Sequence, residues 1–283
     1  MVVERTLEKS ILSQINAIRT LKELRSFVAS EADVISKMSS HFWSNEGTIV
    51  IWKALELALK IITAIDKALS EMTRANSASS MIQKYKNDWW KIDADYRTFR
   101  LQTDADDKLQ TLSRHIRTIY RDYQNQLNEN FLNLVIKQKH LSAPACQTDR
   151  CGAQAGLSIE GILSQSEFWG KVTSSKKRRA VILVDALRFE LGQDLASRLK
   201  KSMRDAEIIC EPLIALMPTL TPIGMSNLIP ARDIKVDVVD GNWQIKSKDF
   251  TGNLVHVAER KKNYQETSPQ SNALLLGSFG FSL

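Results

Sequence analysis

Glycine and proline are distributed very unevenly along this chain of 283 residues. Residues 1–143 hold one of the 11 glycines, Gly47, and none of the six prolines. Proline breaks a helix interior and glycine weakens it, so a long segment that lacks both favours uninterrupted helices. The distribution therefore predicts an all-helical domain over residues 1–143 and a region richer in turns after it.

Apolar residues within this first half recur at the three- and four-residue spacing of a helix face. One such face runs over residues 3–24, and another lies on a helix that we expect over about residues 106–139. The stretch 49–69 is apolar on more than one side, which predicts a helix at the centre of the domain. Its five charged residues are too many for a membrane span, so no membrane partner is expected.

Charge and cysteine usage narrow the class of protein. The net charge of +7 comes from 39 basic and 32 acidic residues; residues 1–140 carry 21 and 17 of them, a balance of +4, and the rest carries +3. Because the excess is spread evenly, it does not mark a basic arm, and nucleic-acid binding is a weaker alternative. Three cysteines and the lack of an apolar leader predict a cytoplasmic protein.

The hydrophobic period changes in the second half of the chain. Residues 144–165 contain proline, glycine and serine and are typical of a linker. The run AVILV, residues 180–184, predicts a strand that is covered on both faces, and it is followed by a helical pattern over 189–200. Further along we expect a strand at 207–210, a helix at 222–228 and a strand at 234–239. This alternation predicts a mostly parallel sheet, in which ligands bind at the carboxyl ends of the strands.

Asp185 directly follows the apolar run 180–184, so its carboxylate is expected at the carboxyl end of a central strand. That position suits a metal ligand in an α/β enzyme. A simpler alternative is that Asp185 caps the next helix by accepting hydrogen bonds from backbone N–H groups. Position alone leaves both interpretations open.

Thr221 precedes Pro222 and an apolar helical stretch. Proline is favoured at the first helical position and threonine just before it, so Thr221 can simply be the N-cap. The same place also offers N–H groups to a phosphoryl oxygen, with a hydroxyl beside them that a divalent metal can activate as a nucleophile. Thr221 is therefore a candidate nucleophile as well as a candidate cap.

Two segments together resemble a known family. AVILVDALRFELGQDLASRL (180–199), followed by ALMPTLTPIGMSNLIP (215–230), is similar to the PglZ domain, a member of the alkaline phosphatase superfamily associated with BREX-type bacterial phage defence. Three shorter stretches are similar to PglZ type A proteins: WWKIDADYRTFR (89–100), QSEFW (165–169) and VDVVDGNWQI (236–245). The resemblance is dense from about residue 166 to residue 241 and diffuse over the helical half.

The resemblance implies a metal-dependent phosphohydrolase, a phosphatase or phosphodiesterase, with a binuclear site in which zinc is the expected metal. It implies that Asp185 is a metal ligand, and that Thr221 contacts the metal and is the nucleophile that is transiently phosphorylated. Other phage-defence subunits are the expected partners. The expected organisation is a helical domain (1–143), a linker (144–165) and an incomplete alkaline phosphatase-like α/β domain (166–283) with a mostly parallel sheet.

The chain departs from the family in its metal ligands, which in this superfamily include Asp and His residues late in the domain. His256 is the one histidine after Thr221, and a packed or surface strand residue is the simpler interpretation for it. After Glu266 the chain has no charged residue. We therefore expect a C-terminally truncated copy that is inactive in this form, with a non-catalytic scaffold subunit of the defence complex as the alternative.

Three other sequence features have a simple structural explanation as well as a functional one. Cys146 and Cys151 form a single C-x4-C pair, so a structural zinc site is not expected. The basic run 176–179 can be a solvated connector or a nucleic-acid contact. Trp89 and Trp90 can stack on bases, but their helical spacing favours core packing.

Overall fold

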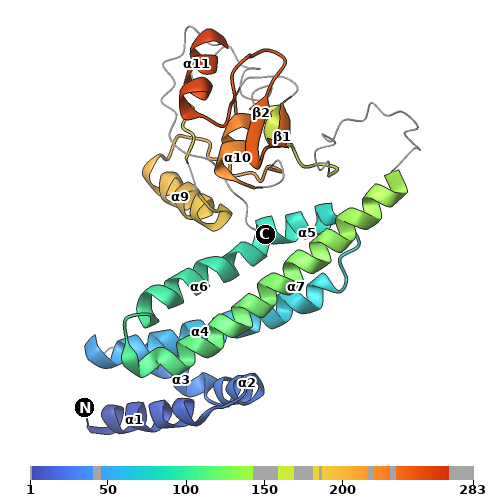
Figure 1. Cartoon of the computed structure of the whole chain (residues 1–283). Helices are drawn as coiled ribbons and strands as arrows, with labels where there is room; N and C mark the ends of the chain where they lie inside the picture. Colours follow the sequence, from blue (N-terminus) through green and yellow to red (C-terminus); the bar gives the residue numbers. More distant parts are fainter. Residues whose placement is uncertain are drawn as a thin grey trace. The chain divides into compact units, whose positions relative to one another are not determined.

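The computed structural model of the chain describes residues 2–40, 46–142, 159–168, 181–184, 187–215, 219–229 and 234–267. The chain divides into two compact units, residues 1–140 and 141–282 (Figure 1). No helix within the described ranges combines the length and the apolar character needed to cross a membrane.

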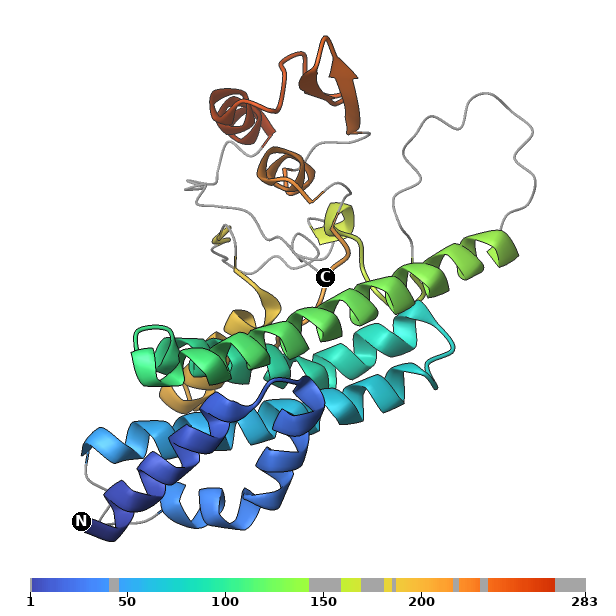
Figure 2. The ribbon, with the colours of Figure 1, turned by 60° about the horizontal axis from the view of Figure 1, so that its bottom comes forward.

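The first unit is helical throughout its described residues. Its helices are α1 (Val2–Ala17), α2 (Leu21–Ser30), α3 (Ala32–Ser39), α4 (Glu46–Met72), α5 (Ala78–Lys84), a π-helix (Tyr85–Trp89), α6 (Trp90–Thr103), a 3-10 turn (Asp107–Leu109) and α7 (Gln110–Ser142). Figures 1 and 2 show α4, α6 and α7 running side by side. The helices expected over 49–69 and 106–139 are confirmed as α4 and α7. α4 is three residues longer at each end, whereas α7 begins four residues later than expected and ends three residues later.

Helix α4 is the centre of this unit. It contacts α1, α2, α3 and α6. Along its length it buries residues on several sides, among them Trp52, Leu55, Ile61 and Ile65 at 1% exposure or less. Burying a large apolar side chain contributes roughly 1.5–3 kcal/mol, so a helix with many such positions orders its neighbours. The prediction of a central helix over residues 49–69 is confirmed.

A capping box defines the start of α2. Thr20 Oγ1 accepts a hydrogen bond from the N–H of Glu23 at 3.2 Å, and Glu23 Oε2 accepts one from the N–H of Thr20 at 3.4 Å. Glu23 also accepts from the N–H of Arg19 at 2.8 Å, and these backbone bonds lower the pKa of its carboxyl. This reciprocal arrangement satisfies N–H groups that the helix leaves without partners and fixes the turn between α1 and α2.

A cluster of tyrosines joins α6 to α7. Tyr85 and Tyr120 both donate hydrogen bonds from their hydroxyls to the carboxylate of Asp93, the second at 2.8 Å. The ring of Tyr96 stacks on that of Tyr120, with centroids 3.7 Å apart and planes inclined by 12°. Tyr123, about one turn further along α7, is 1% exposed, and burial and the nearby Asp93 charge raise the pKa of its hydroxyl.

The aromatic segment before α6 packs into this unit. Trp89 ends the π-helix with 2% exposure, and its Nε1 donates to Glu71 Oε2 at 3.1 Å. A buried indole with a hydrogen-bond partner is a core side chain. For Trp89, core packing is therefore the correct interpretation of the sequence, and a base-stacking role is not.

Matched tyrosine substitutions on α7 test the Asp93 cluster. Tyr120→Phe removes a donor to Asp93 and an acceptor for Gln124 Nε2, so we expect the free energy of unfolding to fall by about 2 kcal/mol. Tyr123→Phe removes a buried hydroxyl that makes no hydrogen bond within the described residues, and we expect it to change stability by less than about 0.5 kcal/mol. Urea unfolding of the full chain measures both; equal losses would contradict the assignment.

The second unit contains short elements around a small apolar core. They are a 3-10 turn (Gln165–Glu167), α9 (Phe189–Ser202), α10 (Thr221–Asn227), β1 (Lys235–Val239), β2 (Asn242–Lys246) and α11 (Val257–Thr267). The core comprises Leu183, Ile223, Leu228, Ile229, Ile245, Phe250 and Leu254. It joins α10, the hairpin and the segment before α11. The helices expected at 189–200 and 222–228 are confirmed as α9 and α10.

The strands of this unit differ from those expected. β1 confirms the strand at 234–239, but it pairs antiparallel with β2, across a turn in which Asp240 and Gly241 have φ values of 51° and 75°. Positive φ at both positions is the geometry of a tight hairpin turn. Within the described residues the sheet has these two strands, so the mostly parallel sheet is not what they form. Parallel pairing occurs at an isolated bridge between Ser164 and Ile214.

The strand predicted at 207–210 is wrong, and the one predicted at 180–184 is represented among the described residues only by a single bridge residue, Leu183. In the latter segment Leu183 is 5% exposed, but Ile182 is 71% exposed, so the run is not covered on both faces. Residues 207–210 have no regular structure, and Ile209 is 67% exposed. A β-branched run becomes a strand only when neighbouring strands supply its hydrogen bonds and cover its faces, and among the described residues no strand ladder forms at either segment.

Candidate functional site

Of the two predicted site residues, the structure describes only Thr221. Asp185 lies outside the described residues. Thr221 is the first residue of α10, and its side chain is exposed. Leu220 occupies the N-cap position, so Thr221 does not cap the helix as expected. The fixed φ of Pro222 suits either of the first two helical positions. For this reason the predicted helix starts at Pro222, one residue later than the observed start at Thr221.

The rest of α10 lies in the core. Ile223 and Met225 of the helix, and Leu228 and Ile229 directly after it, are all 5% exposed or less. Ile223 N–H and Gly224 N–H bond to the carbonyl of Leu220 at 3.0 and 2.9 Å, which forms the first turn. The helix thus exposes its first residue and buries those that follow. This places the Thr221 hydroxyl at the surface on a helix that is otherwise packed.

Buried polar side chains surround α10. Gln165 is 3% exposed; its Nε2 donates to the carbonyl of Gly224 at 3.2 Å, and its Oε1 accepts from Asn227 Nδ2 at 3.4 Å. On the other side, Ser226 Oγ lies 2.9 Å from the carbonyl of Leu254. Hydrogen bonds to buried groups are costly to lose, because the abandoned partner stays desolvated.

Arg260 of α11 completes the second set of contacts. It is 5% exposed, and its Nη1 donates to the carbonyls of Leu254 and Val255 at 2.8 and 2.7 Å. Burial of this guanidinium lowers its pKa. The carbonyl of Leu254 therefore accepts a hydrogen bond from α11 and lies against the Ser226 hydroxyl of α10, which also contacts the Pro222 carbonyl at 2.6 Å.

A buried carboxylate stands at the start of α9. Glu190 is 1% exposed, and its Oε1 lies 3.0 Å from Nε of Arg188, whose side chain is half exposed. An acidic residue in the first turn is favoured by the helix dipole, and the arginine compensates its burial. Sequence reasoning missed Glu190, Gln165 and Arg260. The available signal was a charged residue inside the apolar pattern F-E-L at 189–191.

The described residues do not fit a metal centre by themselves. Within the ranges that the structure describes, no group of three or more His, Cys, Asp or Glu side chains is placed to hold an ion. His256 is exposed and lies in the turn directly before α11, not in a strand. The described donors therefore provide no binuclear zinc site, and their arrangement supports no reaction step that runs through a metal.

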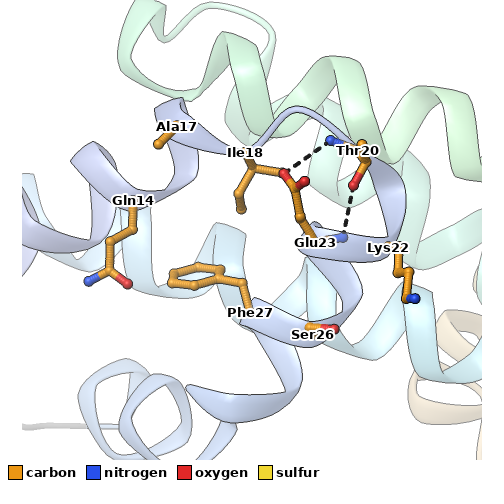
Figure 3. Close-up of a pocket in the computed structure, with 8 residues that line it drawn as sticks. All are labelled: Gln14, Ala17, Ile18, Thr20, Lys22, Glu23, Ser26 and Phe27. Atoms are coloured by element: carbon orange, nitrogen blue, oxygen red, sulfur yellow. Dashed lines mark hydrogen bonds between the residues drawn. The ribbon is translucent and has the colours of Figure 1, made fainter.

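A pocket in the first unit lies at the junction of α1 and α2 (Figure 3). Its lining includes Ile18, Phe27 and the capping pair Thr20 and Glu23. Apart from Lys22, no charged group joins Glu23 among the lining residues. The pocket contains neither predicted site residue and offers no set of groups for phosphoryl chemistry.

Comparison with known proteins addresses the second unit directly. Residues 170–242 match the family model PglZ, described as the BREX system PglZ alkaline phosphatase-like domain. This segment, called the PglZ region below, is similar to that domain. The PglZ region contains both Asp185 and Thr221, together with Arg188 and Glu190. The resemblance read from the sequence is thereby confirmed.

A curated relative extends the similarity beyond the PglZ region. The alkaline phosphatase-like protein BrxZ of Escherichia coli O9:H4 (strain HS) is 20% identical over 288 aligned residues, which cover 96% of this chain. The chain spans 31% of the length of BrxZ. No solved structure matches the chain at a significant level.

Arg188 and Glu190 yield an asymmetric stability prediction. Arg188→Met leaves the Glu190 carboxylate buried without its cation, and we expect a loss of about 3 kcal/mol of unfolding free energy. Glu190→Gln leaves a half-exposed arginine in water and should cost less than half as much. Chemical unfolding followed by circular dichroism measures both variants. A larger loss of unfolding free energy for Glu190→Gln than for Arg188→Met would show that Arg188 does not compensate the buried charge of Glu190.

Proposed function

We propose that this chain belongs to a metal-dependent phosphohydrolase, a phosphatase or phosphodiesterase, of a bacterial BREX-type phage-defence system. Thr221 is its nucleophile, and Asp185 and Thr221 contact the divalent metal, for which zinc is the expected ion. The observation that carries the proposal is the PglZ match over residues 170–242, which includes both residues. The similarity to BrxZ over 96% of the chain supports the defence context.

The position of Thr221 supports its role. Its hydroxyl is exposed, and it makes no hydrogen bond within the described part of the chain, so the oxygen is accessible to a phosphoester. In the proposed reaction the Thr221 hydroxyl loses its proton as its oxygen forms a bond to phosphorus. The bond to the leaving alcohol breaks, and the alcohol takes up a proton. Water then cleaves the phosphothreonine and releases phosphate or a phosphomonoester. A divalent metal held by Asp185 and Thr221 would supply charge stabilisation for the phosphoryl oxygens.

The finer features of the fold belong to the same proposal. The parallel sheet of an alkaline phosphatase-like domain remains a prediction, and the parallel bridge between Ser164 and Ile214 supports it. The division into a helical domain (1–143), a linker (144–165) and an α/β domain (166–283) also remains a prediction. So does a cytoplasmic location.

Substitution of Thr221 tests the proposal. In the full-length gene product with zinc supplied, Thr221→Ala should abolish metal-dependent release of nitrophenol from its phosphate ester and diester, a loss of at least about 1,000-fold. Thr219→Ala is the matched control, because Thr219 is also exposed and lies two residues earlier. We expect this control to keep the wild-type rate. Unchanged turnover in Thr221→Ala would remove Thr221 as the nucleophile.

A second candidate function is docking of other phage-defence subunits by the helical unit. Exposed apolar side chains on α6 and α7 favour it: Leu101 is 77% exposed, Leu132 is 52% and Ile136 is 51%. Leu132 and Ile136 are four residues apart and share one face of α7. Scattered exposed leucines are common, so this pair on one face is the more informative feature.

Paired substitutions separate docking from catalysis. Leu132→Glu with Ile136→Glu should abolish co-purification of the other defence subunits when the system is expressed together, while the nitrophenol assay is unchanged. Asn133→Glu places a charge on a neighbouring exposed position of α7 and should leave co-purification intact. Retention of the subunits by the paired variant would rule out this face.

A further inference from the structure

The last backbone carbonyls of α10 have no hydrogen-bond partner within the helix. The inference drawn from these carbonyls rests on the proposed role of Thr221. A helix of seven residues cannot bond its own last four carbonyls, because no further helical N–H groups follow them. The carbonyls of Met225 and Ser226 accept from the N–H groups of Leu228 and Ile229, both at 3.3 Å. The carbonyl of Gly224 needs a partner from elsewhere.

Gln165 supplies that partner from a distant part of the chain. It lies 59 residues before Gly224, and its Nε2 donates to the Gly224 carbonyl at 3.2 Å. Its Oε1 accepts from Asn227 at the end of the same helix, so both polar atoms of one buried amide contact α10. A side chain that satisfies two groups of one short helix fixes the rotation of that helix as well as its position.

Gln165 is itself held in place by backbone contacts. Its N–H donates to the carbonyl of Ile214 at 2.8 Å, and the N–H of Ile214 donates to the carbonyl of Leu163 at 2.9 Å. These bonds make the parallel bridge between Ser164 and Ile214. The segment that carries Gln165 is thereby fixed to the stretch of chain that leads towards Thr221.

We propose that Gln165 is a positioning residue for Thr221, acting through the Gly224 carbonyl and Asn227 of α10. Gln165 lies before the PglZ region, residues 170–242. It does not reach a substrate; it sets the orientation of the helix whose first residue carries the hydroxyl. A displacement of about 1 Å at a reacting group can cost a hundredfold in rate, so such an anchor matters to catalysis.

The loss of Gln165 should loosen α10 without unfolding the unit. The apolar face of the helix and the bond from Ser226 to the Leu254 carbonyl both remain. Gln165→Met keeps the approximate volume of the side chain and removes both hydrogen bonds. Gln193→Met on α9 is the matched control, because Gln193 is only partly buried and makes no hydrogen bond within the described residues.

The first measurement needs no catalysis. A nitroxide is attached at Thr221→Cys in the full chain, with Cys146, Cys151 and Cys210 changed to serine. Gln165→Met should make the label more mobile and speed amide exchange over residues 223–229 by about tenfold, at a temperature where circular dichroism shows intact folding. Gln193→Met should change neither. Unchanged label mobility and exchange in Gln165→Met would overturn the proposal.

A second variant and a kinetic measurement also test the role of Gln165. Should Gln165→Met fail to fold, Asn227→Ala decides instead, because it removes only the hydrogen bond to Gln165 Oε1 and keeps the one from Gln165 to the Gly224 carbonyl; it should give a smaller increase in mobility, and no increase would overturn the proposal. In the full-length gene product, Gln165→Met should lower kcat for nitrophenyl phosphate by about tenfold or more and leave KM within about twofold. Wild-type turnover in Thr221→Ala would rule out the proposed function. The mobility of the nitroxide label would still test the role of Gln165 in that case.

Discussion

The second unit depends on the burial of α10. This helix is too short to satisfy its own carbonyls, yet its residues from Ile223 onward lie in the core. Burial is possible because polar groups of the helix find partners elsewhere. The Gly224 carbonyl accepts a hydrogen bond from Gln165, and the Ser226 hydroxyl lies against the Leu254 carbonyl, which Arg260 also contacts. The hairpin and the segment before α11 add the apolar contacts. An exposed threonine on a helix anchored in this way has a defined position, which a nucleophile requires.

The first unit is organised by a different constraint. Its centre is one long helix, α4, whose apolar residues cover more than one side, and shorter helices pack around it. One polar cluster of this unit centres on the partly buried Asp93, which accepts from two tyrosine hydroxyls. Nothing in this cluster resembles a site for phosphoryl chemistry. The chemistry predicted for the chain therefore rests on the PglZ region of the second unit, and the first unit is the better candidate for contacts with partner subunits.

The sequence predicts the helices well because helix signals are local. The lack of glycine and proline before residue 143, and the spacing of apolar residues, were sufficient to place α4 and α7. Strand prediction at 180–184 and 207–210 was less successful. A strand depends on partners elsewhere in the chain, which a local β-branched run does not reveal. Thr221 was correctly placed at the start of a helix, although Leu220 takes the N-cap. Gln165 could not be predicted, since its role depends on a contact across 59 residues.

In the proposed site, Asp185 and Thr221 share one divalent cation in the PglZ region. Oxygen ligands of zinc lie about 2.0–2.2 Å from the ion, so two of them on one ion cannot be more than about 4.4 Å apart. The most direct measurement is a crystal structure of the full-length gene product grown with zinc, with the ion located by its anomalous scattering. We predict one ion bound by an Asp185 carboxylate oxygen and the Thr221 hydroxyl oxygen. Oxygens more than about 4.4 Å apart, with no common ion, would contradict the account.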